Sequence, residues 1–347
     1  MVLVSGERSG RRPNTPTVSD VAARAGVSTG TVSKALNGRG QLRAETRDRV
    51  AAAARDLGWQ PNVLARSLLA GRSYTVGLIT TDSFGRFTIP VMLGAEDTLG
   101  AGEISVLLCD GRGDPIREQH HLRTLLGRRV DGIMVTGRRL EPRAPIATDL
   151  PVPVVYAFAQ SQRPEDTSVI NDDPQGARLA IDHLLLTGRS AVAHVTGPAR
   201  HVSARLRADS AIATLHAAGL ELVRGDPLWG EWTEAWGREA VALLLRSGTK
   251  FDAIFCGSDQ IARGVLEALR ESGVRVPTEV GVVGFDNWEV MSLASRPLLT
   301  TVDLDLGPLG RFAATKLLEA IDGHPDPGVH TLPCRLVIRQ STAISAP

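Results

Sequence analysis

The sequence predicts an α/β fold, with a small all-α helix-turn-helix headpiece followed by a two-lobed body of doubly wound parallel sheets. A helix-turn-helix pattern within residues 17–37 predicts the headpiece. Seven short apolar runs after residue 74, most of them separated by amphipathic stretches, predict the sheets of the body. With 347 residues, the chain is long enough for two or three domains with their own cores.

The two predicted parts differ in charge, although the whole chain has a formal net charge of only +1. Residues 1–73 contain 12 Lys and Arg against 5 Asp and Glu, whereas the remainder contains 27 against 33. A basic head on an acidic body is typical of a DNA-binding module joined to a ligand-binding module. The alternative is chance clustering of surface charge.

The first sixteen residues are polar and basic, and we expect them to be disordered. They lack the apolar run of a signal peptide, and no segment approaches the roughly 20 apolar residues of a transmembrane helix. We therefore expect a cytoplasmic protein without a membrane partner.

Cys109, Cys256 and Cys334 lack metal-ligand spacing, so we expect buried free thiols and no metal site.

The first helix of the headpiece begins after Thr17, which can form a capping box with Asp20. Four small apolar residues then fall on one helix face: Val18, Val21, Ala22 and Ala25. Gly26 allows a sharp turn, and Ser28 can cap a second helix that begins at Thr29.

The second helix turns three apolar side chains inward: Val32, Ala35 and Leu36. Its outward side chains are short or basic, as contacts to phosphates and base edges require: Thr29, Thr31, Ser33 and Lys34. A third helix is predicted over residues 43–57. The next segment, residues 59–71, contains a two-turn helix that is too short to be stable without support from a partner.

The body alternates predicted strands with predicted helices. The strands cover residues 75–80, 104–109, 132–136, 153–157, 191–196, 251–256 and 280–285. The helices include residues 114–126, 174–187, 203–218, 233–246, 259–272 and 307–321. Continuous apolar strands that alternate with helices predict parallel sheets covered on both faces. Seven such units are too many for one compact sheet of this kind, so we expect two lobes.

The order and spacing of the helix-turn-helix, the WQPNVLARSLLAG segment and the α/β body resemble the lactose repressor (LacI/GalR) family from residue 17 to about residue 343. The resemblance implies a periplasmic-binding-protein-like body whose chain crosses between lobes near Ile170, Pro297 and His324. The implied parts are a tail at 1–16, a headpiece at 17–60, a hinge at 61–73 and a body at 74–343. In the body, the N-lobe takes about 74–170 and 298–324, and the C-lobe about 171–297 and 325–343.

The resemblance also implies which headpiece residues contact DNA: Thr17, Ser28, Thr29, Gly30, Thr31, Ser33, Lys34 and Asn37. Thr29 and Gly30 match base-reading positions of the family, and Lys34 matches a contact position that is usually arginine. Gly30 has no side chain for readout, and Lys34 offers a point charge in place of the bidentate fork of arginine. The alternative is that these are ordinary exposed helix positions.

In the hinge, Leu68 matches the leucine that family members insert into the minor groove, where an apolar wedge kinks the duplex. Asn62, Ala65 and Arg66 would line the groove. The alternative is simple packing against the body, for which Leu69 is the better candidate. We expect a palindromic operator with a deformable pyrimidine–purine step at its centre.

The resemblance implies an effector site in the cleft between the lobes, formed by Asp82, Phe84, Asn171, Arg205, Trp232 and Asp286. Arg205, Trp232 and Asp286 match an arginine, an aromatic residue and an aspartate that contact the effector in the family. Ser258 and Asp259 either line the pocket or only cap the helix that begins there. Charged groups beside an aromatic plate fit a sugar, and they also fit a nucleoside.

Together these features predict a sequence-specific transcription repressor that binds double-stranded operator DNA as a homodimer under the control of a sugar effector. No leucine heptads follow the last strand, which favours a dimer over a tetramer. The alternative is a small-molecule-binding protein or an enzyme on the same body. No GxSxG motif or Cys/His arrangement indicates catalysis, and no cofactor is implied. Whether the effector induces or corepresses stays open.

Overall fold

The computed structural model of the chain describes residues 16–36, 41–59 and 71–343. The chain divides into two compact units, with the division between Arg72 and Ser73. Several predicted DNA contacts lie outside the described residues, and their roles stay predictions: Asn37, Asn62, Ala65, Arg66 and Leu68.

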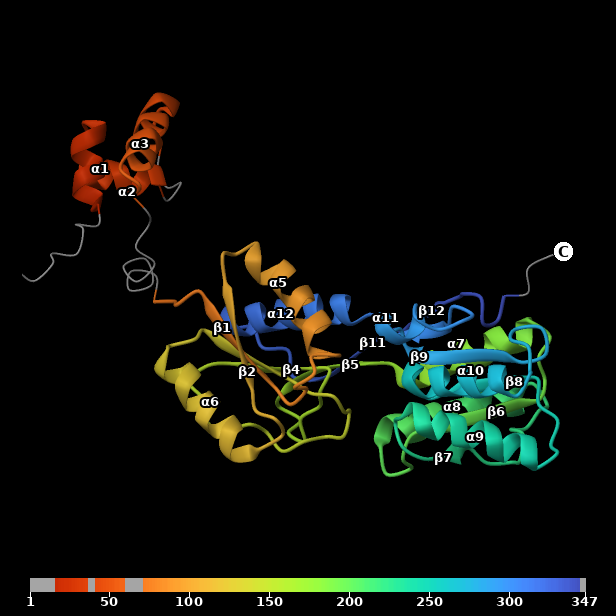
Figure 1. The fold of residues 1–347 in the computed structure, drawn as a ribbon. Coiled ribbons are helices and arrows are strands. Elements are labelled where there is room, and N and C mark those ends of the chain that lie inside the picture. Colours follow the sequence, from red (N-terminus) through yellow and green to blue (C-terminus); the bar gives the residue numbers. More distant parts are fainter. Residues whose placement is uncertain (1–15, 37–40, 60–70, 344–347) are drawn as a thin grey trace, which may run out of the picture. The chain divides into compact units, whose positions relative to one another are not determined.

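The headpiece contains three helices, α1 (Val18–Ala25), α2 (Thr29–Leu36) and α3 (Ala44–Asp56), shown in red and orange in Figure 1. Small side chains from all three meet in its core: Val21, Ala22, Ala25, Val32, Val50, Ala53 and Ala54. Because valine and alanine are short, the three helices can pack closely around this small core.

Hydrogen bonds at the helix ends fix the turn between α1 and α2. The predicted capping box is confirmed, because the Asp20 N–H donates to Thr17 Oγ1 at 3.3 Å and the Thr17 N–H donates to Asp20 Oδ2 at 2.7 Å. Gly26 ends α1 with a φ of 65°, a left-handed conformation that favours glycine. At the start of α2, the Thr31 N–H donates to Ser28 Oγ at 3.2 Å.

The N-lobe of the body is built on a sheet of parallel strands in the order β11-β5-β4-β3-β1-β2. In chain order these strands are β1 (Thr75–Thr80), β2 (Ser105–Asp110), β3 (Gly132–Thr136), β4 (Val154–Ala157), β5 (Thr167–Asn171) and β11 (Gly328–Leu332). Helices α5 (Thr88–Gly100) and α12 (Leu306–Ile321) cover one face, and α6 (Pro115–Gly127) covers the other (Figure 1). Successive side chains of a strand alternate between the faces, so Leu78 packs in the cluster of α5 and α12 whereas Ile79 packs in the cluster of α6.

The C-lobe repeats this plan with the strand order β12-β10-β9-β8-β6-β7. Its strands are β6 (Val192–Thr196), β7 (Leu228–Trp229), β8 (Ala253–Cys256), β9 (Gly281–Asp286), β10 (Thr300–Asp303) and β12 (Arg335–Val337), and only β12 pairs antiparallel. Helices α7 (Asp173–Leu186) and α8 (Val202–Ala217) cover one face, and α9 (Glu234–Arg246) and α10 (Asp259–Glu271) cover the other. A short helix, α11 (Glu289–Ser292), follows β9. The predicted α/β fold with two lobes of parallel sheet is confirmed.

The chain passes between the lobes three times, and two of these crossings differ from prediction. The first follows β5 at Asp172, two residues from the predicted Ile170. The predicted crossing near Pro297 is wrong, because β10 comes later and still pairs in the C-lobe sheet. The predicted crossing near His324 is also wrong, because β11 follows it and pairs with β5 of the N-lobe. The later crossings therefore lie at 304–305 and 333–334.

Glycines allow paired helices on each lobe to approach until backbone meets backbone. A Cβ on Gly310 of α12 would lie 2.0 Å from the carbonyl oxygen of Val91 in α5. A Cβ on Gly264 of α10 would lie 2.0 Å from the carbonyl oxygen of Glu234 in α9. Neither backbone can move without shifting a whole helix, so any side chain at these positions forces the pair apart.

Across the described ranges, no helix is long and apolar enough to cross a membrane. The same residues contain no group of three or more His, Cys, Asp and Glu side chains that could hold a metal ion. All three cysteines are free; Cys256 and Cys334 are buried, whereas Cys109 is half-buried.

We predict that Gly310→Ala destabilises the body, because the new methyl group overlaps the Val91 carbonyl. Overpacking of this kind costs about 1–3 kcal/mol, which exceeds the roughly 1 kcal/mol that alanine gains over glycine in a helix. The matched control is Gly100→Ala at the end of α5, where a Cβ meets nothing within 4 Å. Thermal unfolding should show a lower melting temperature for Gly310→Ala only; equal melting temperatures for both variants would contradict the close-approach argument.

Candidate functional site

The headpiece presents a short polar surface on α2. Thr29, Gly30, Ser33 and Lys34 are exposed, and Thr31 is half-buried. Val32, on the opposite side of the same helix, is fully buried in the headpiece core. The packing of Val32 therefore fixes which side chains of α2 face outward, and these are the residues that sequence analysis selected for DNA contact.

A cavity of about 460 Å³, here called the main cleft, lies where the two lobes of the body meet. It is lined by Asp82, Phe84, Arg86, Phe87, Arg138, Arg139, Glu141, Phe158, His201, Ser203, Arg207, Trp232, Ser258, Gln260, Asp286 and Trp288. These residues lie at or after the carboxyl ends of β1, β3 and β4 in one lobe and of β6, β7, β8 and β9 in the other, where doubly wound sheets bind ligands. The volume is typical of a small-molecule site.

Four of the predicted effector contacts line the main cleft: Asp82, Phe84, Trp232 and Asp286. Ser258 fills both of the roles left open, because it lines the cleft and its Oγ accepts a hydrogen bond from the Ile261 N–H at 3.3 Å. Asp259 does not line it; this carboxyl is buried and accepts hydrogen bonds from the Trp288 N–H and the Thr301 hydroxyl.

Two predicted contacts are not at the cleft. Arg205 is exposed, and its guanidinium donates to the Ala199 carbonyl at 2.8 Å. The arginine of α8 that lines the cleft is Arg207, two residues later. Successive residues of a helix are about 100° apart, so this difference of two positions moves the side chain to the other side of α8. Asn171 is buried behind the cleft, where its amide donates to Asp173 Oδ1 at 2.9 Å.

Arg207 is held rigidly from behind. Its Nε donates to Asp173 Oδ1 at 3.0 Å, and its Nη1 donates to the Gly257 carbonyl at 2.6 Å. The guanidinium carbon lies 3.7 Å from the centre of the Phe285 ring. On the cleft side, Nη1 is 3.7 Å from Asp286 Oδ1. A guanidinium with this many partners keeps one orientation, so it presents fixed donors to a ligand.

Asp286 connects the two lobes. It ends β9 of the C-lobe, and the guanidinium of Arg86, from the loop before α5 of the N-lobe, donates to its carboxylate. The same guanidinium lies 4.5 Å from the Trp288 ring centre and 4.8 Å from that of Phe87. Asp286 has a φ of 107°, which strains any residue other than glycine, and such strain is typical of functional positions.

Three carboxyl groups at or beneath the main cleft, those of Asp173, Asp259 and Asp286, have raised pKa values. Burial raises the pKa of Asp173 and of Asp286, and in both cases Arg207 opposes the rise. Burial raises the pKa of Asp259 well above its usual range, and the nearby carboxylate of Asp286 adds to this effect. The arginines are therefore needed to keep Asp173 and Asp286 charged in a buried site.

His201 and Trp232 form a second fixed pair. The Trp232 indole N–H donates to His201 Nδ1 at 2.7 Å, and the two rings are stacked with centres 6.1 Å apart. Because an indole nitrogen can only donate, His201 Nδ1 must accept, and the imidazole proton is on Nε2. Burial, and then the charge of Arg139, lowers the pKa of His201, which favours this neutral form. Gly197 lies directly under the indole, where a Cβ would come within 2.2 Å of the ring.

Three buried polar atoms around the main cleft have no hydrogen-bond partner within the described part of the chain: Arg86 Nε, Glu141 Oε2 and His201 Nε2. Glu141 is an N-lobe residue whose other oxygen accepts from the Val202 N–H of α8 at 2.9 Å, which makes a second contact between the lobes. Buried polar groups are normally satisfied. These donors and this acceptor are therefore positions where a polar ligand would bind.

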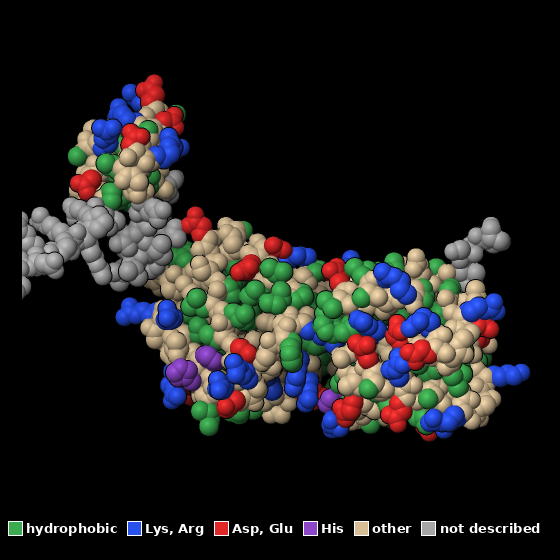
Figure 2. Space-filling model, viewed as in Figure 1, with side chains coloured by type: hydrophobic (Ala, Val, Ile, Leu, Met, Phe, Trp, Pro, Cys, Tyr) green, Lys and Arg blue, Asp and Glu red, His purple; other side chains and the backbone are tan. Residues whose placement is uncertain are grey.

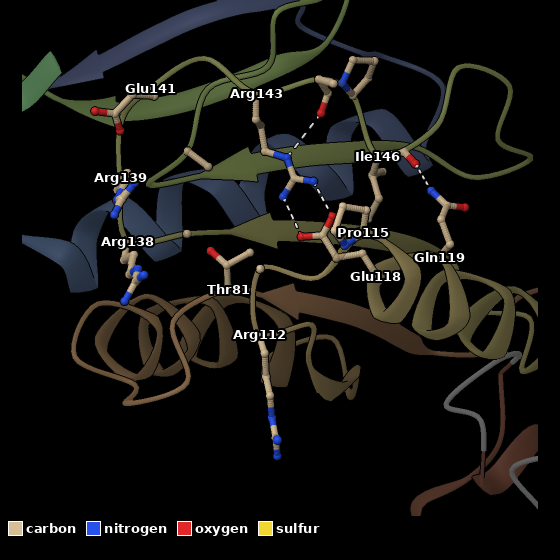
Figure 3. A pocket seen from close by; sticks show the side chains of 15 residues that line it. Thr81, Arg112, Pro115, Glu118, Gln119, Arg138, Arg139, Glu141, Arg143 and Ile146 are labelled. Atoms are coloured by element: carbon tan, nitrogen blue, oxygen red, sulfur yellow. Dashed lines mark hydrogen bonds and ion pairs between the residues drawn. The ribbon is translucent and has the colours of Figure 1, made fainter. Parts of the chain in front are cut away.

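A second cavity of about 600 Å³ adjoins the main cleft in the N-lobe and shares Arg138, Arg139 and Glu141 with it (Figure 3). In its wall, Arg143 binds Glu118 through two hydrogen bonds of 3.1 and 2.5 Å, drawn as dashed lines in Figure 3. This cavity also opens at the carboxyl edge of the sheet, beside Thr81.

Seven important cleft residues were not predicted from the sequence: Arg86, Arg138, Arg139, Glu141, His201, Arg207 and Trp288. Local signals existed for some of them. Arg86 and Trp288 are each two residues from a predicted contact that lines the cleft, Phe84 and Asp286 respectively. His201 lies in the same GPARHVSARLR segment that drew attention to Arg205.

Comparison with known proteins identifies the two parts of the chain. Residues 17–62 match the bacterial regulatory proteins of the lacI family, and residues 181–342 match the periplasmic binding protein-like domain. The catabolite control protein A of Priestia megaterium is 32% identical over 332 residues, which cover 94% of this chain and 99% of that protein.

Two solved structures extend the similarity to the whole fold. A lac repressor dimer bound to operator and the anti-inducer ONPF has a TM-score of 0.73 and 28% identity, covering 95% of this chain and 100% of that one. A complex of the transcriptional regulator CelR with cellobiose has a TM-score of 0.66 and 30% identity, covering 94% of this chain and 99% of that one.

We predict that the Trp232–His201 hydrogen bond survives mild acidification. Because the pKa of His201 lies below the ordinary value of 6.5, more than half of the rings stay neutral at pH 6.5, where an unperturbed histidine is half protonated. Protonation at lower pH replaces the acceptor on Nδ1 with a donor and breaks the bond. Nuclear magnetic resonance of ¹⁵N-tryptophan-labelled protein should show less than half of the total change in the Trp232 indole N–H signal between pH 8 and 6.5.

The signal is assigned by its loss in Trp232→Phe. His201→Gln is the control, since a glutamine carbonyl still accepts from the indole but does not titrate. Half of the signal change occurring at or above pH 6.5 would contradict the lowered pKa of His201.

Proposed function

Because this chain belongs to the lacI family of bacterial regulatory proteins, we propose that it is a transcription repressor whose binding to operator DNA is controlled by a small sugar in the main cleft. It is a DNA-binding regulator and not an enzyme. The body with the main cleft and the headpiece are separate compact units. A regulator of this kind acts where the operator is, so we place it in the cytoplasm.

The observation that carries the sugar assignment is the combination of unsatisfied polar atoms with aromatic surface in the main cleft. Glu141 Oε2 can accept from a hydroxyl, and His201 Nε2 can donate to one. The half-buried indole of Trp232 offers a flat surface to the C–H face of a sugar ring. The cellobiose complex of CelR supports this choice over a nucleoside.

The DNA-reading residues are proposed from the exposed face of α2 together with the family resemblance. Thr29 and Lys34, both exposed, are the proposed contacts to base edges and phosphates. Thr17 and Ser28 are proposed to contact the DNA backbone, and their hydroxyls also cap the starts of α1 and α2. Insertion of Leu68 at the centre of a palindromic operator stays a prediction, since it lies outside the described residues.

We further propose that the functional form is a homodimer, as in the operator complex of the lac repressor. On the N-lobe, three large apolar side chains are exposed on α5 and β2: Ile89, Leu93 and Leu108 are 41%, 53% and 45% accessible. Figure 2 shows hydrophobic side chains gathered over α5 and continuing toward α11, where Val290 and Leu293 are also exposed. A contiguous apolar surface of this kind fits a second copy of the chain.

We predict that sensing and DNA reading are separable by mutation. Lys34→Ala should weaken operator binding about ten-fold or more, because it removes one DNA contact from each subunit. Trp232→Ala should require at least about ten-fold more effector, because it removes the plate against which the ring packs. The measurement is operator affinity across a titration with the sugar that most raises the melting temperature in a screen of mono- and disaccharides.

Arg205→Ala is the matched control, since Arg205 lies near the cleft on α8 but is exposed and does not line it. It should respond to the sugar like the parent. A parent-like response of Trp232→Ala would contradict the placement of the effector in the main cleft.

Dimerisation gives a further prediction. Leu93→Asp should produce monomers in analytical ultracentrifugation and lose most operator affinity, because a buried unpaired carboxylate at an apolar interface costs several kcal/mol. The control is Leu186→Asp on α7 of the C-lobe, an apolar side chain that is 86% accessible but distant from α5. Dimers of normal stability in Leu93→Asp would show that the second copy binds elsewhere.

A further inference from the structure

Two neighbouring arginines stand where the main cleft and the second cavity meet. Arg138 and Arg139 follow β3, are exposed, and line both cavities. Figure 3 shows their side chains projecting from one short loop, close to Glu141. Within the described ranges of the chain, neither has an ion-pair partner.

The other arginines around the two cavities each have a carboxylate partner: Arg86 with Asp286, Arg207 with Asp173, Arg143 with Glu118, and Arg112 with Asp110. Their charges are balanced locally. The positive charge without a partner is therefore concentrated at Arg138 and Arg139, on the N-lobe side of the junction.

The influence of this charge extends across the cleft to the other lobe. Arg139 is, after burial, the largest cause of the lowered pKa of His201, which belongs to the C-lobe. The field of Arg139 therefore acts across the cleft, against the smaller opposing effects of Glu141 and Glu231 on His201. Walls of low dielectric, here including Phe87, Phe158 and Trp288, focus such a potential on a charged ligand.

We propose that the effector is an acidic sugar derivative, whose ring occupies the main cleft and whose carboxylate or phosphate group binds Arg138 and Arg139. Guanidinium groups bind both kinds of anion through paired N–H donors. The ring hydroxyls meet Glu141 Oε2 and His201 Nε2, and Trp232 supports the apolar face of the ring. This inference rests on the proposed function, because it specifies the chemical class of the same effector.

The two cavities together have room for an anionic group beside Arg138 and Arg139 and for a neutral ring in the main cleft. The second cavity provides space next to the arginine pair for a substituent that extends from the ring. Glu118, the buried carboxylate of that cavity, is neutralised by Arg143, so it does not repel an anion there. Three acidic residues line the main cleft. Asp82 is engaged by the N–H groups of Phe87 and Thr88 at 2.8 and 3.1 Å, Asp286 by the guanidinium of Arg86, and one oxygen of Glu141 by the Val202 N–H.

The test is calorimetric titration of the full-length protein with matched sets of ligands: glucose, glucuronate and glucose 6-phosphate, and the corresponding galactose compounds, with ribose and ribose 5-phosphate. At least one acidic member should bind ten-fold or more tightly than its neutral parent. The advantage should shrink as salt concentration rises, because an exposed guanidinium pair is screened. The uronate and phosphate arms distinguish the two sources of negative charge.

The double variant Arg138→Gln/Arg139→Gln should lose the ten-fold preference for the acidic member. The matched control, Arg200→Gln/Arg205→Gln, removes the same charge from exposed positions near the cleft that do not line it, and should keep the preference.

The outcomes separate this inference from the proposed function. If neutral sugars bind as tightly as their acidic forms and the double variant binds both like the parent, the inference is overturned while the sugar-effector function stands. If no member of any set binds to the protein or alters operator affinity, the sugar-effector function is contradicted and the inference falls with it.

Discussion

The buried chain of charges from Arg86 through Asp286 and Arg207 to Asp173 is the interaction on which the cleft depends. Asp173 starts α7, Arg207 lies on α8, Asp286 ends β9, and Arg86 comes from the other lobe. Each carboxylate is buried, so it requires a cation, and each cation is held by more than one partner. Loss of Arg207 alone would leave the buried Asp173 carboxylate without a cation, at a cost of about 3–5 kcal/mol. Elements far apart in the sequence are therefore fixed together before any effector binds.

Much of the fold could be predicted because its determinants are local. Apolar runs such as residues 75–80 and 132–136 are strands buried on both faces, and their composition alone indicates this. The missed strands carry weaker local signals. β10 has the sequence TTVD and is buried although half polar, and β11 alternates between partly buried and exposed residues. Their places in the sheets depend on pairing with distant strands. Because these two strands were not predicted, the crossings that follow them were predicted too early in the chain.

The residues of the candidate site also differ in whether local sequence motifs could predict them. Asp286 and Trp232 follow recognisable motifs, and the structure brings both to the main cleft. The prediction that Arg205 contacts the effector was wrong, because a motif match that is two residues out of register points to the opposite side of a helix. Arg86 and Glu141 could not be predicted from the C-lobe motifs that they contact, because their importance arises only where the two lobes meet.

The contacts between the lobes also limit how an effector can act. A ligand shifts an equilibrium between two lobe arrangements only by its difference in affinity for them. Arg86–Asp286 and Glu141–Val202 already join the lobes without a ligand. A sugar hydroxyl that donates to the Asp286 carboxylate in place of Arg86 removes one of these contacts and favours separation of the lobes. A ligand that leaves this pair intact and binds Arg86 Nε, Glu141 Oε2 and His201 Nε2 adds contacts to both lobes and favours their closure. The lobe arrangement that a ligand favours therefore depends on whether Asp286 keeps Arg86 as its partner.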